Sequence, residues 1–563
     1  GQIVAGAAQW QFSFMGYTLV LLRVDSLSYL VGVIFAIITF LAILYAAVAA
    51  TPRLQLIALL YAGMSLGAVF AGDWITLLVF WELMAITSTF LIWQERGEAI
   101  GAGYRYLLFH GFGGALLAAG IALLYLGGGS SIVGPLAGIP DVTYQLWAAV
   151  FIVLGIGVNA GFILLHTWLP DAYPRANFVA SVFLCVYTTK TAVYLLARAQ
   201  PGSEYIAFMG ALMAVFGVTF AVLQNDMRRL LSYHIISQVG YMVVGVGLLG
   251  WWGAANEVGQ LGLDGGMAHV FNHILYKALL FMAIGVIIWK TGENALSRIG
   301  GLQKKMPVTA LAFWVAAFSI SGVPLFNGFV SKGMVLLAAD QTNIWLWVLL
   351  EIASFGTFLS FLKLGYFAFL RPGTTEASDP PLLMQAAMLG VAALCIAIGV
   401  YPPLLYAFLP YPTSYQAYNP VTIVATLLVL GAAAAFFFTI GKRVLEPHDT
   451  RLRDADVVYM ATCSAVVAIA GGLQSAFRAV YVCLGGVVPV LFAAGKSAAL
   501  MVDWDVNWNL SALAGMLLVV LAFLLLQSSL SAGVIEISVG AVLVTALLAI
   551  ALFFTGRRWY EDT

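Results

Sequence analysis

The chain has 563 residues, of which 62% are hydrophobic and only 9% are charged, and its 25 Lys and Arg side chains balance 25 Asp and Glu side chains. Soluble domains carry about 25% charged and about 45–50% apolar residues, so this composition excludes an ordinary soluble protein. The zero formal charge gives no indication of nucleic-acid binding. Uncharged runs recur along the chain, each long enough to cross ~30 Å of hydrocarbon. The composition therefore predicts a polytopic protein embedded in a lipid bilayer.

In chain order the predicted elements are helices, because a segment that crosses a bilayer must satisfy its own backbone polar groups. We expect spans at about 26–50, 53–71, 73–93, 101–126, 145–168, 177–199, 204–225, 230–251, 266–290, 307–338, 343–370, 381–401 and 420–441, and again at 508–527 and 531–555. The intervening stretch 455–501 contains Arg478 and Lys496, and it fits either a helix lying along the cytoplasmic face or a hairpin of two helices. The predicted fold class is an all-α polytopic membrane helical bundle.

The basic residues are divided unequally between alternate loops. One set of loops contains Arg53, Arg96, Arg175, Arg228, Arg229, Arg298, Lys304, Lys305, Arg371, Lys442, Arg443, Arg451 and Arg453. The other set has essentially Arg198 alone, with acidic residues around it: Asp73, Asp141, Glu257, Asp264 and Asp340. Short cytoplasmic loops carry an excess of Lys and Arg. The basic set is therefore predicted to be cytoplasmic, whereas 402–419 faces the other side.

The four cysteines are far apart and lie within apolar runs: Cys185, Cys395, Cys463 and Cys483. They show no CxxC or Cys/His metal spacing, so we expect neither a metal centre nor another cofactor. We interpret these cysteines as small buried hydrophobic residues.

Several ionisable residues lie inside predicted spans, where a charge costs several kcal/mol and so indicates function. Glu82 lies well inside the span at 73–93, and Lys190 lies near the centre of the span at 177–199. The alternative is a structural ion pair, or a lysine whose ammonium group reaches the membrane surface. We expect both residues to be functional.

One predicted helix face carries His269, His273 and Lys277 at positions i, i+4 and i+8. An imidazole can accept and donate a proton near neutral pH, and burial lowers the affinity of a lysine for its proton. Such a row predicts a proton relay. The His-x3-His spacing also occurs in metal sites, but no catalytic Glu lies between the histidines and no third ligand is evident.

A proline and two glycines interrupt the span at 307–338, within 321–328, which predicts a broken helix beside Lys332. Lys332 is therefore a further candidate for proton translocation. Lys363 is a weaker candidate in the next span. His234 and Gln238 either extend the polar path or form local hydrogen bonds.

These residues lie in sequence motifs that resemble the antiporter-like subunits of multisubunit sodium/proton (Mrp-type) antiporters, respiratory complex I and membrane-bound hydrogenases. The most specific motifs are LHTWLPDA at 165–172, NDMRRLLSYHIISQVGY at 225–241 and HILYKALLF at 273–281. The similarity runs from VDSLS at 24–28 to about residue 370, and its details are most similar to the D-type Mrp subunit.

The resemblance implies two inverted five-helix repeats, at 53–199 and 204–370. The remaining parts are then an N-terminal segment with the first span (1–52), two further spans (381–441), a lateral helix at 455–501 and two C-terminal spans (508–555). It implies that Glu82 is the essential glutamate of the family, Lys190 a lysine of the first repeat, Lys277 the central lysine, and Lys332 the outer charged position on the broken helix.

The chain departs from the family pattern at three places. The family normally has two helices before VDSLS, whereas only about 23 residues precede it here. The lysine that usually partners the glutamate is replaced by Asn159, and the usual helix-breaking proline by Leu164. The Glu–Lys switch is therefore absent in its usual form, and we expect Glu82 to respond to Lys190 or to a neighbouring subunit.

The predicted function is that of a transporter subunit, not an enzyme. It would translocate protons in exchange for sodium, together with other membrane subunits, in a bacterial inner membrane. The alternatives are a proton-pumping module of a redox complex, an energy-coupling subunit for inorganic carbon uptake, and a structural scaffold with a degraded proton path.

Overall fold

The computed structural model describes residues 8–14, 17–136, 141–250 and 256–448, and five isolated positions between 454 and 464. Apart from those positions, the predicted stretch 455–501 lies outside the described residues, and so do the spans at 508–527 and 531–555. The part up to 448 belongs to one compact unit of the chain. It contains 12 helices that are long and apolar enough to cross a membrane. The prediction of a polytopic helical bundle is therefore confirmed.

A β-hairpin precedes the first helix and was not predicted. Its strands β1 (Ala8–Phe14) and β2 (Tyr17–Val24) are antiparallel. Asp73 holds the hairpin against the helices, because its carboxylate accepts a hydrogen bond from the backbone N–H of Val20 at 2.7 Å. The hairpin ends at Asp25, whose side chain caps the next helix.

The helices of the first half follow in chain order. They are α1 (Ser26–Ala49), α2 (Pro52–Phe70), α3 (Trp74–Ile92), α4 (Glu98–Leu126), α5 (Val142–Ala160), α6 (Trp168–Arg175), α7 (Phe178–Leu184) and α8 (Thr188–Ala199). Thr51, Asp73 and Asp141 cap α2, α3 and α5 by accepting hydrogen bonds from backbone N–H groups of the first turn. These polar caps mark where the chain enters the apolar layer.

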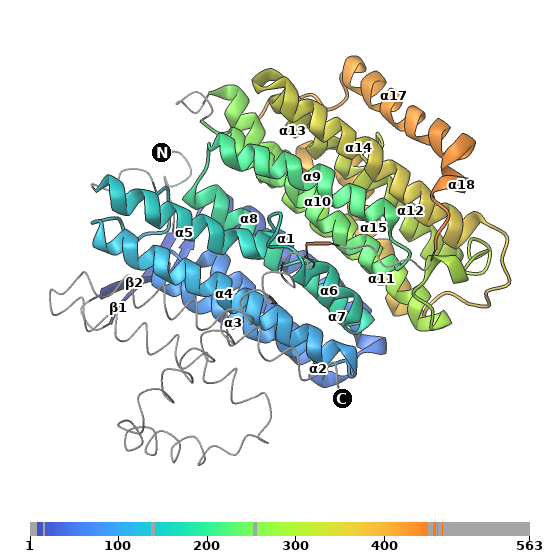
Figure 1. The fold of residues 1–563 in the computed structure, drawn as a ribbon, viewed down its shortest axis with the longest axis horizontal. Coiled ribbons are helices and arrows are strands. Elements are labelled where there is room, and N and C mark those ends of the chain that lie inside the picture. Colours follow the sequence, from blue (N-terminus) through green and yellow to red (C-terminus); the bar gives the residue numbers. More distant parts are fainter. Residues whose placement is uncertain are drawn as a thin grey trace, which may run out of the picture. The chain divides into compact units, whose positions relative to one another are not determined.

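The second half continues with longer helices. They are α9 (Glu204–Leu223), α10 (Met227–Leu248), α11 (Glu257–Thr291), the short η2 (Leu296–Arg298), α12 (Pro307–Ser321), α13 (Asn327–Thr342), α14 (Ile344–Gly365) with the π-turn η3 (Tyr366–Leu370), α15 (Leu382–Val400), α16 (Pro403–Tyr406), α17 (Pro420–Phe436), η4 (Phe437–Gly441) and α18 (Lys442–Val444). Figure 1 shows α9 to α14 running side by side.

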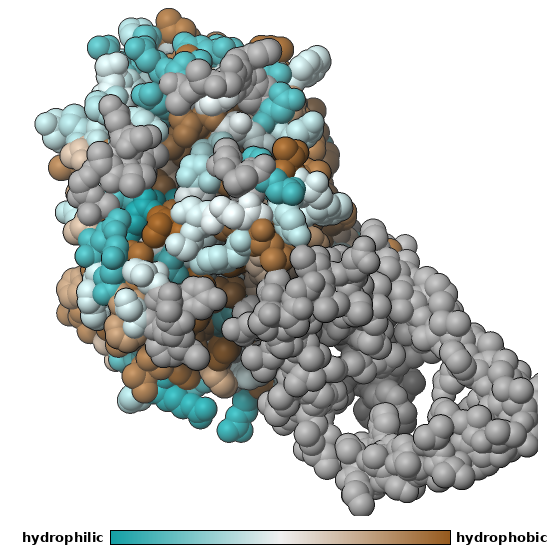
Figure 2. Space-filling model, turned by 90° about the vertical axis from the view of Figure 1, so that its left-hand side faces the viewer, coloured by the Kyte–Doolittle hydropathy of each residue, from teal (hydrophilic) through white to brown (hydrophobic). Residues whose placement is uncertain are grey.

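Three helices, α8, α10 and α11, lie at the centre, because nearly all their side chains are buried. The outer helices instead expose large apolar side chains, among them Leu56, Val79, Leu146, Leu212, Trp345, Leu382 and Leu428. Figure 2 shows hydrophobic residues beside hydrophilic patches on the face that contains the left-hand ends of the helices in Figure 1. An apolar outer surface around a polar-containing centre is the arrangement expected in a bilayer.

Two helix breaks have the same geometry. Gly161 ends α5 and Gly322 ends α12, both with left-handed backbone, at φ 77° and 76°. Three residues after each glycine a leucine is also left-handed: Leu164 at φ 72° and Leu325 at φ 76°. The predicted break at 321–328 is thus present. The continuous span predicted at 145–168 is wrong, because the left-handed Gly161 ends the helix although no proline follows.

Two other boundaries differ from the prediction. The span at 177–199 is divided into α7 and α8, so Lys190 lies in the first turn of α8 and not near the centre of a continuous helix. Helix α11 begins at Glu257, so Asp264 lies within the helix and not in a loop. The glycines of this stretch act as packing positions, since a Cβ at Gly266 would approach the backbone of α10 at 2.9 Å.

Candidate functional site

A row of buried polar side chains lies where α10, α11 and α13 meet. The imidazole of His269 on α11 has its Nδ1 2.9 Å from Ser331 Oγ on α13 and its Nε2 3.2 Å from Gln238 Oε1 on α10. The hydroxyl of Tyr276 is also 3.2 Å from His269 Nε2. Gln238 continues the row to α14 through Thr357, at 3.4 Å. His269 is therefore connected to three neighbouring helices through groups that can exchange protons.

The row continues along α11 to His273 and Lys277, both fully buried. The His269 and His273 rings are 6.3 Å apart, and Tyr276 lies 5.3 Å from His273 between ring centroids. Neither His273 nor Lys277 has a side-chain hydrogen-bond partner in the described part of the chain. His234 on α10 is in the same situation and interacts electrostatically with Lys277. Groups that can carry charge but lack fixed partners are suited to transient protonation.

Lys190 lies at the junction of the two halves. Its ammonium group donates to the carbonyl oxygen of Cys185 at 2.6 Å and to Thr189 Oγ1 at 2.9 Å. Lys190 and Lys277 interact electrostatically, and so do Lys190 and His273. Lys190 is thus the member of the first half that responds to the charge on α11.

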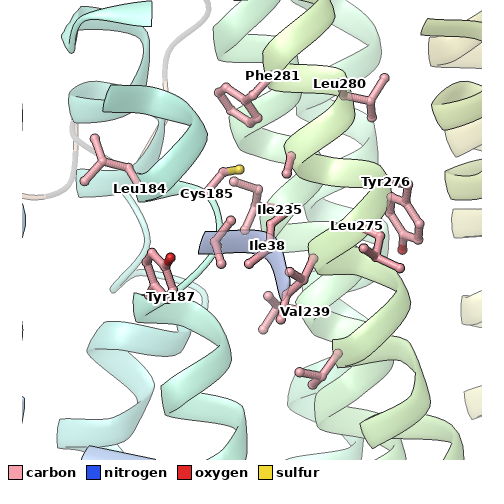
Figure 3. Close-up of a cluster of buried hydrophobic side chains, with 14 of the residues drawn as sticks. Ile38, Leu184, Cys185, Tyr187, Ile235, Val239, Leu275, Tyr276, Leu280 and Phe281 are labelled. Atoms are coloured by element: carbon pink, nitrogen blue, oxygen red, sulfur yellow. The ribbon is translucent and has the colours of Figure 1, made fainter. Parts of the chain in front are cut away.

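An apolar cluster fills the space around this junction. Figure 3 shows Cys185 and Tyr187, from the segment between α7 and α8, facing side chains of α10 and α11. The cluster includes Ile38, Ile235, Val239, Leu275, Leu280 and Phe281. The interaction between Lys190 and Lys277 is therefore poorly screened, because its surroundings are apolar.

Lys332 lies near the break between α12 and α13. Its ammonium group lies 4.8 Å from the centroid of the Tyr241 ring, in a cation–π contact, and interacts electrostatically with Glu351 on α14. The sequence reading missed Glu351. The signal was available, since Glu351 is an ionisable residue in a predicted span, and the same rule that selected Glu82 applies to it.

Lys363 has a different environment. Its ammonium group donates to the carbonyl oxygens of Val222 and Gln224, at 2.7 and 2.9 Å, at the end of α9. Such bonds satisfy carbonyls that a helix end leaves without partners. We interpret Lys363 as a cap of α9.

Glu82 lies halfway along α3, and its carboxylate packs on Gly114 of α4, where a Cβ would overlap with Oε1. Oε1 is buried and has no hydrogen-bond partner among the described residues. Asn159 on α5 is fully buried, and both of its amide atoms lack partners there. No hydrogen bond or ion pair within that part of the chain joins Glu82 to Asn159 or to a lysine.

The sequence reading also missed two other buried groups. His110 on α4 is buried with both nitrogens unpartnered in the described region. Asp264 on α11 is buried and accepts a hydrogen bond from the backbone N–H of Tyr411, at 3.2 Å. A lone histidine on an apolar face gives a weak signal, and the glycines around Asp264 suggested a loop. Within the described ranges, no cluster of His, Cys, Asp or Glu could hold a metal ion.

A charged cluster joins the hairpin to α8. Arg198 donates to both carboxylate oxygens of Asp25, at 3.0 and 2.6 Å, and Arg23 lies 3.3 Å from the same carboxylate. Burial would raise the pKa of the Asp25 carboxyl, but the hydrogen bonds and charge of Arg198, with Arg23, hold it below its ordinary value. Arg198, predicted as a lone basic residue in its loop, is thus part of a buried ion cluster.

Comparison with known proteins places these features in a family. The family described as "NADH:quinone oxidoreductase/Mrp antiporter, TM" matches residues 71–360. NADH-quinone oxidoreductase subunit N of Desulforudis audaxviator is 33% identical over 382 residues, which cover 62% of this chain and 74% of the relative. A Na(+)/H(+) antiporter subunit of Alkalihalophilus pseudofirmus is 30% identical over 402 residues, covering 65% of this chain and 49% of the relative. The chain therefore spans about half the length of that antiporter subunit.

Solved structures share the fold. A chain of the Mrp complex from Dietzia sp. DQ12-45-1b matches with a TM-score of 0.66 at 24% identity, covering 76% of this chain and 90% of that one. A chain of the membrane-bound sulfane sulfur reductase, an archaeal respiratory membrane complex, matches with a TM-score of 0.65 at 23% identity, covering 93% and 92%. The chain belongs to the NADH:quinone oxidoreductase/Mrp antiporter family, as an antiporter-like membrane subunit.

Proposed function

We propose that this chain translocates protons as one subunit of a multisubunit membrane complex, and that the complex exchanges them for a monovalent cation such as sodium. The observation that carries the proposal is the buried row on α11, in which His269, His273 and Lys277 lie between Lys190 and Lys332. A row of ionisable groups inside a bilayer is costly and has no structural pairing to account for it.

Charge repulsion couples the members of this row. A proton on Lys277 raises the energy of a second positive charge on Lys190 or His273, because the apolar surroundings screen the interaction poorly. The proton then passes along α11 through the imidazoles toward Ser331 and Lys332. Glu351 stabilises the proton when it reaches Lys332. Each transfer changes the charge at the next position, so protons move in steps along the row.

Two further observations support the proposal. The matching breaks at Gly161 and Gly322 are what two related repeats at 53–199 and 204–370 would have. The relatives named as subunits of an antiporter or of a quinone oxidoreductase belong to complexes. We therefore expect other membrane subunits as partners, and we place the complex in a bacterial inner membrane.

The test is sodium-driven proton movement in vesicles that contain the complex purified from its native membrane. A sodium gradient should change the internal pH, read from a pH-sensitive dye. We expect Glu82→Gln to lower the rate at least tenfold. Glu95→Gln, at an exposed glutamate beyond α3, is the matched control and should retain it. Wild-type vesicles that move no protons with any monovalent cation would refute cation exchange.

The second candidate is a proton pump driven by a redox reaction of partner subunits. The relative named subunit N of an NADH-quinone oxidoreductase, at 33% identity, favours it. In that case the purified complex would contain redox subunits, and proton movement would follow an electron donor and a quinone instead of a sodium gradient.

A further inference from the structure

We propose that His110 carries protons between Glu82 and the hydroxyl cluster at the start of α8, beside Lys190. The inference rests on the proposed function and deepens it. It adds a residue to the path in the half of the molecule where Asn159 replaces an ionisable side chain.

The first argument is the environment of the imidazole. His110 is 1% exposed, and neither ring nitrogen has a hydrogen-bond partner among the described residues. A buried polar group without partners is destabilising, and an apolar side chain of similar shape would avoid this cost. The two ring nitrogens are therefore available for transient bonds during proton transfer.

The second argument is its position relative to Glu82. The Glu82 carboxylate covers Gly114, which follows His110 by one turn on the same face of α4. Positions i and i+4 of a helix lie about 5–6 Å apart at Cβ, a separation that one bridging water spans. The absence of a Cβ at position 114 provides the space in which the carboxylate lies.

The third argument is the hydroxyl cluster on the other side of the imidazole. The His110 ring stacks on Tyr106, with centroids 4.0 Å apart. The Tyr106 hydroxyl donates to Ser88 Oγ at 3.0 Å and lies 3.3 Å from Thr188 Oγ1. Thr188 Oγ1 in turn lies 2.6 Å from the Tyr61 hydroxyl.

This cluster ends at Lys190. Thr188 opens α8, and the next residue, Thr189, accepts a hydrogen bond from Lys190 Nζ at 2.9 Å. Protonatable groups thus follow one another from α3, across α4, to α8. Glu82 has no ion pair within the described part of the chain, so His110 provides its connection to the lysines.

The transfer balances without any other reactant. Protonated Glu82 gives its proton to the bridging water, which gives one of its own to a ring nitrogen of His110. The imidazolium releases the proton from its other nitrogen to the hydroxyl cluster. There each hydroxyl accepts one proton and passes on another. The groups that face His110 from the packed helices are Glu82 on α3, Trp168 on α6 and Thr188 on α8, and Trp168 carries no exchangeable charge.

The experiment compares three variants in vesicles containing the complete complex. His110→Phe keeps a flat ring against Tyr106, His110→Gln keeps polarity without a titrating group, and His110→Ala leaves space for added imidazole. We expect proton flux at least tenfold below wild type in all three. Imidazole at millimolar concentration should restore at least a third of wild-type flux to His110→Ala, and none to His110→Phe. Wild-type vesicles with the same imidazole correct for its own permeation.

Two outcomes overturn the inference. One is His110→Phe with more than half of wild-type flux, and the other is loss of flux in His110→Ala that imidazole does not restore, which indicates a structural role. Lys277→Met, measured in parallel, separates this inference from the proposed function. If Lys277→Met loses flux while His110→Phe keeps it, only the role of His110 fails. If Lys277→Met keeps wild-type flux, the proposed function fails.

Discussion

Lys190 Nζ donates a hydrogen bond of 2.6 Å to the carbonyl oxygen of Cys185, across the break between α7 and α8. In a continuous helix that carbonyl would accept from a backbone N–H four residues later. Here the ammonium group replaces the missing donor, and a positive charge at the end of a helix is also favoured by the helix dipole. The charge of Lys190 and the shape of the chain around it therefore depend on each other.

We expect Lys190→Met to remove proton flux and also to lower the thermal stability of the complex in detergent. The loss of the donor leaves a buried carbonyl unsatisfied, at a cost of about 1–3 kcal/mol. The control is Lys363→Met, which also removes a donor to helix-end carbonyls. It should lower the melting temperature and keep at least half of the flux. Full flux in Lys190→Met would show that Lys190 only stabilises the break.

We expect the stability of the unit that contains the hairpin to fall when the pH falls below about 4. The pKa of Asp25 is below its ordinary value in the folded protein, so the unfolded chain binds the proton more tightly. This contribution to stability is complete above the unfolded pKa and is lost as the pH falls through the folded one. Asp25→Asn should cost about 3–5 kcal/mol near pH 7, as expected when one partner of a buried ion pair is removed.

The measurement for Asp25 is the melting temperature of the complex between pH 3 and pH 8. The difference between wild type and Asp25→Asn should be large at neutral pH and should shrink at the acidic end. Asp141→Asn is the control, because Asp141 caps α5 at an exposed position without an arginine partner. A difference that stays constant across the pH range would contradict the proposed contribution of the ion cluster.

Asn159→Lys should change the pH dependence of proton flux. The side chain is fully buried and its amide atoms make no hydrogen bond within the described residues, so a lysine there adds a new ionisable group to the first half. We expect the pH optimum to move or the rate to fall, whereas Asn159→Ala should change little. Flux of both variants between pH 6 and pH 9 is the measurement. A lysine variant that matches wild type at every pH would show that position 159 does not face Glu82.

The predicted topology can be tested with single cysteines and an impermeant thiol reagent. We expect positions beside Lys304 and within 442–448 to be labelled from the cytoplasmic side, because these loops carry the basic residues. Positions within 402–419 should be labelled only from the other side. Labelling of both groups from one side would contradict the order of spans.

Charges in apolar runs were the part of the site that the sequence predicted well. Glu82, Lys190, Lys277 and Lys332 all lie buried or partly buried inside helical spans. The reason is physical, since such charges are rare in membrane helices unless they have a role. The same rule, applied to every span, would also have selected Glu351.

The parts that could not be predicted depend on tertiary contacts. The break between α7 and α8 contains neither glycine nor proline, and it is held by Lys190 and by the Tyr61 hydroxyl, which accepts from the backbone N–H of Thr188 at 3.2 Å. The start of α11 was misread because glycine indicates a turn in local sequence. Here Gly262 and Gly266 lie where α11 packs closely against Gly245 of α10.

The central claim is that protons cross this subunit through the buried row on α11. The most direct measurement is the initial rate of proton uptake into vesicles that contain the complete complex, compared between Lys277→Met and Lys290→Met. Lys290 lies in the last turn of the same helix, with its ammonium group 4.7 Å from the Trp289 ring. We predict a rate at least tenfold below wild type for Lys277→Met and an unchanged rate for Lys290→Met. Equal, wild-type rates in both variants would contradict the claim.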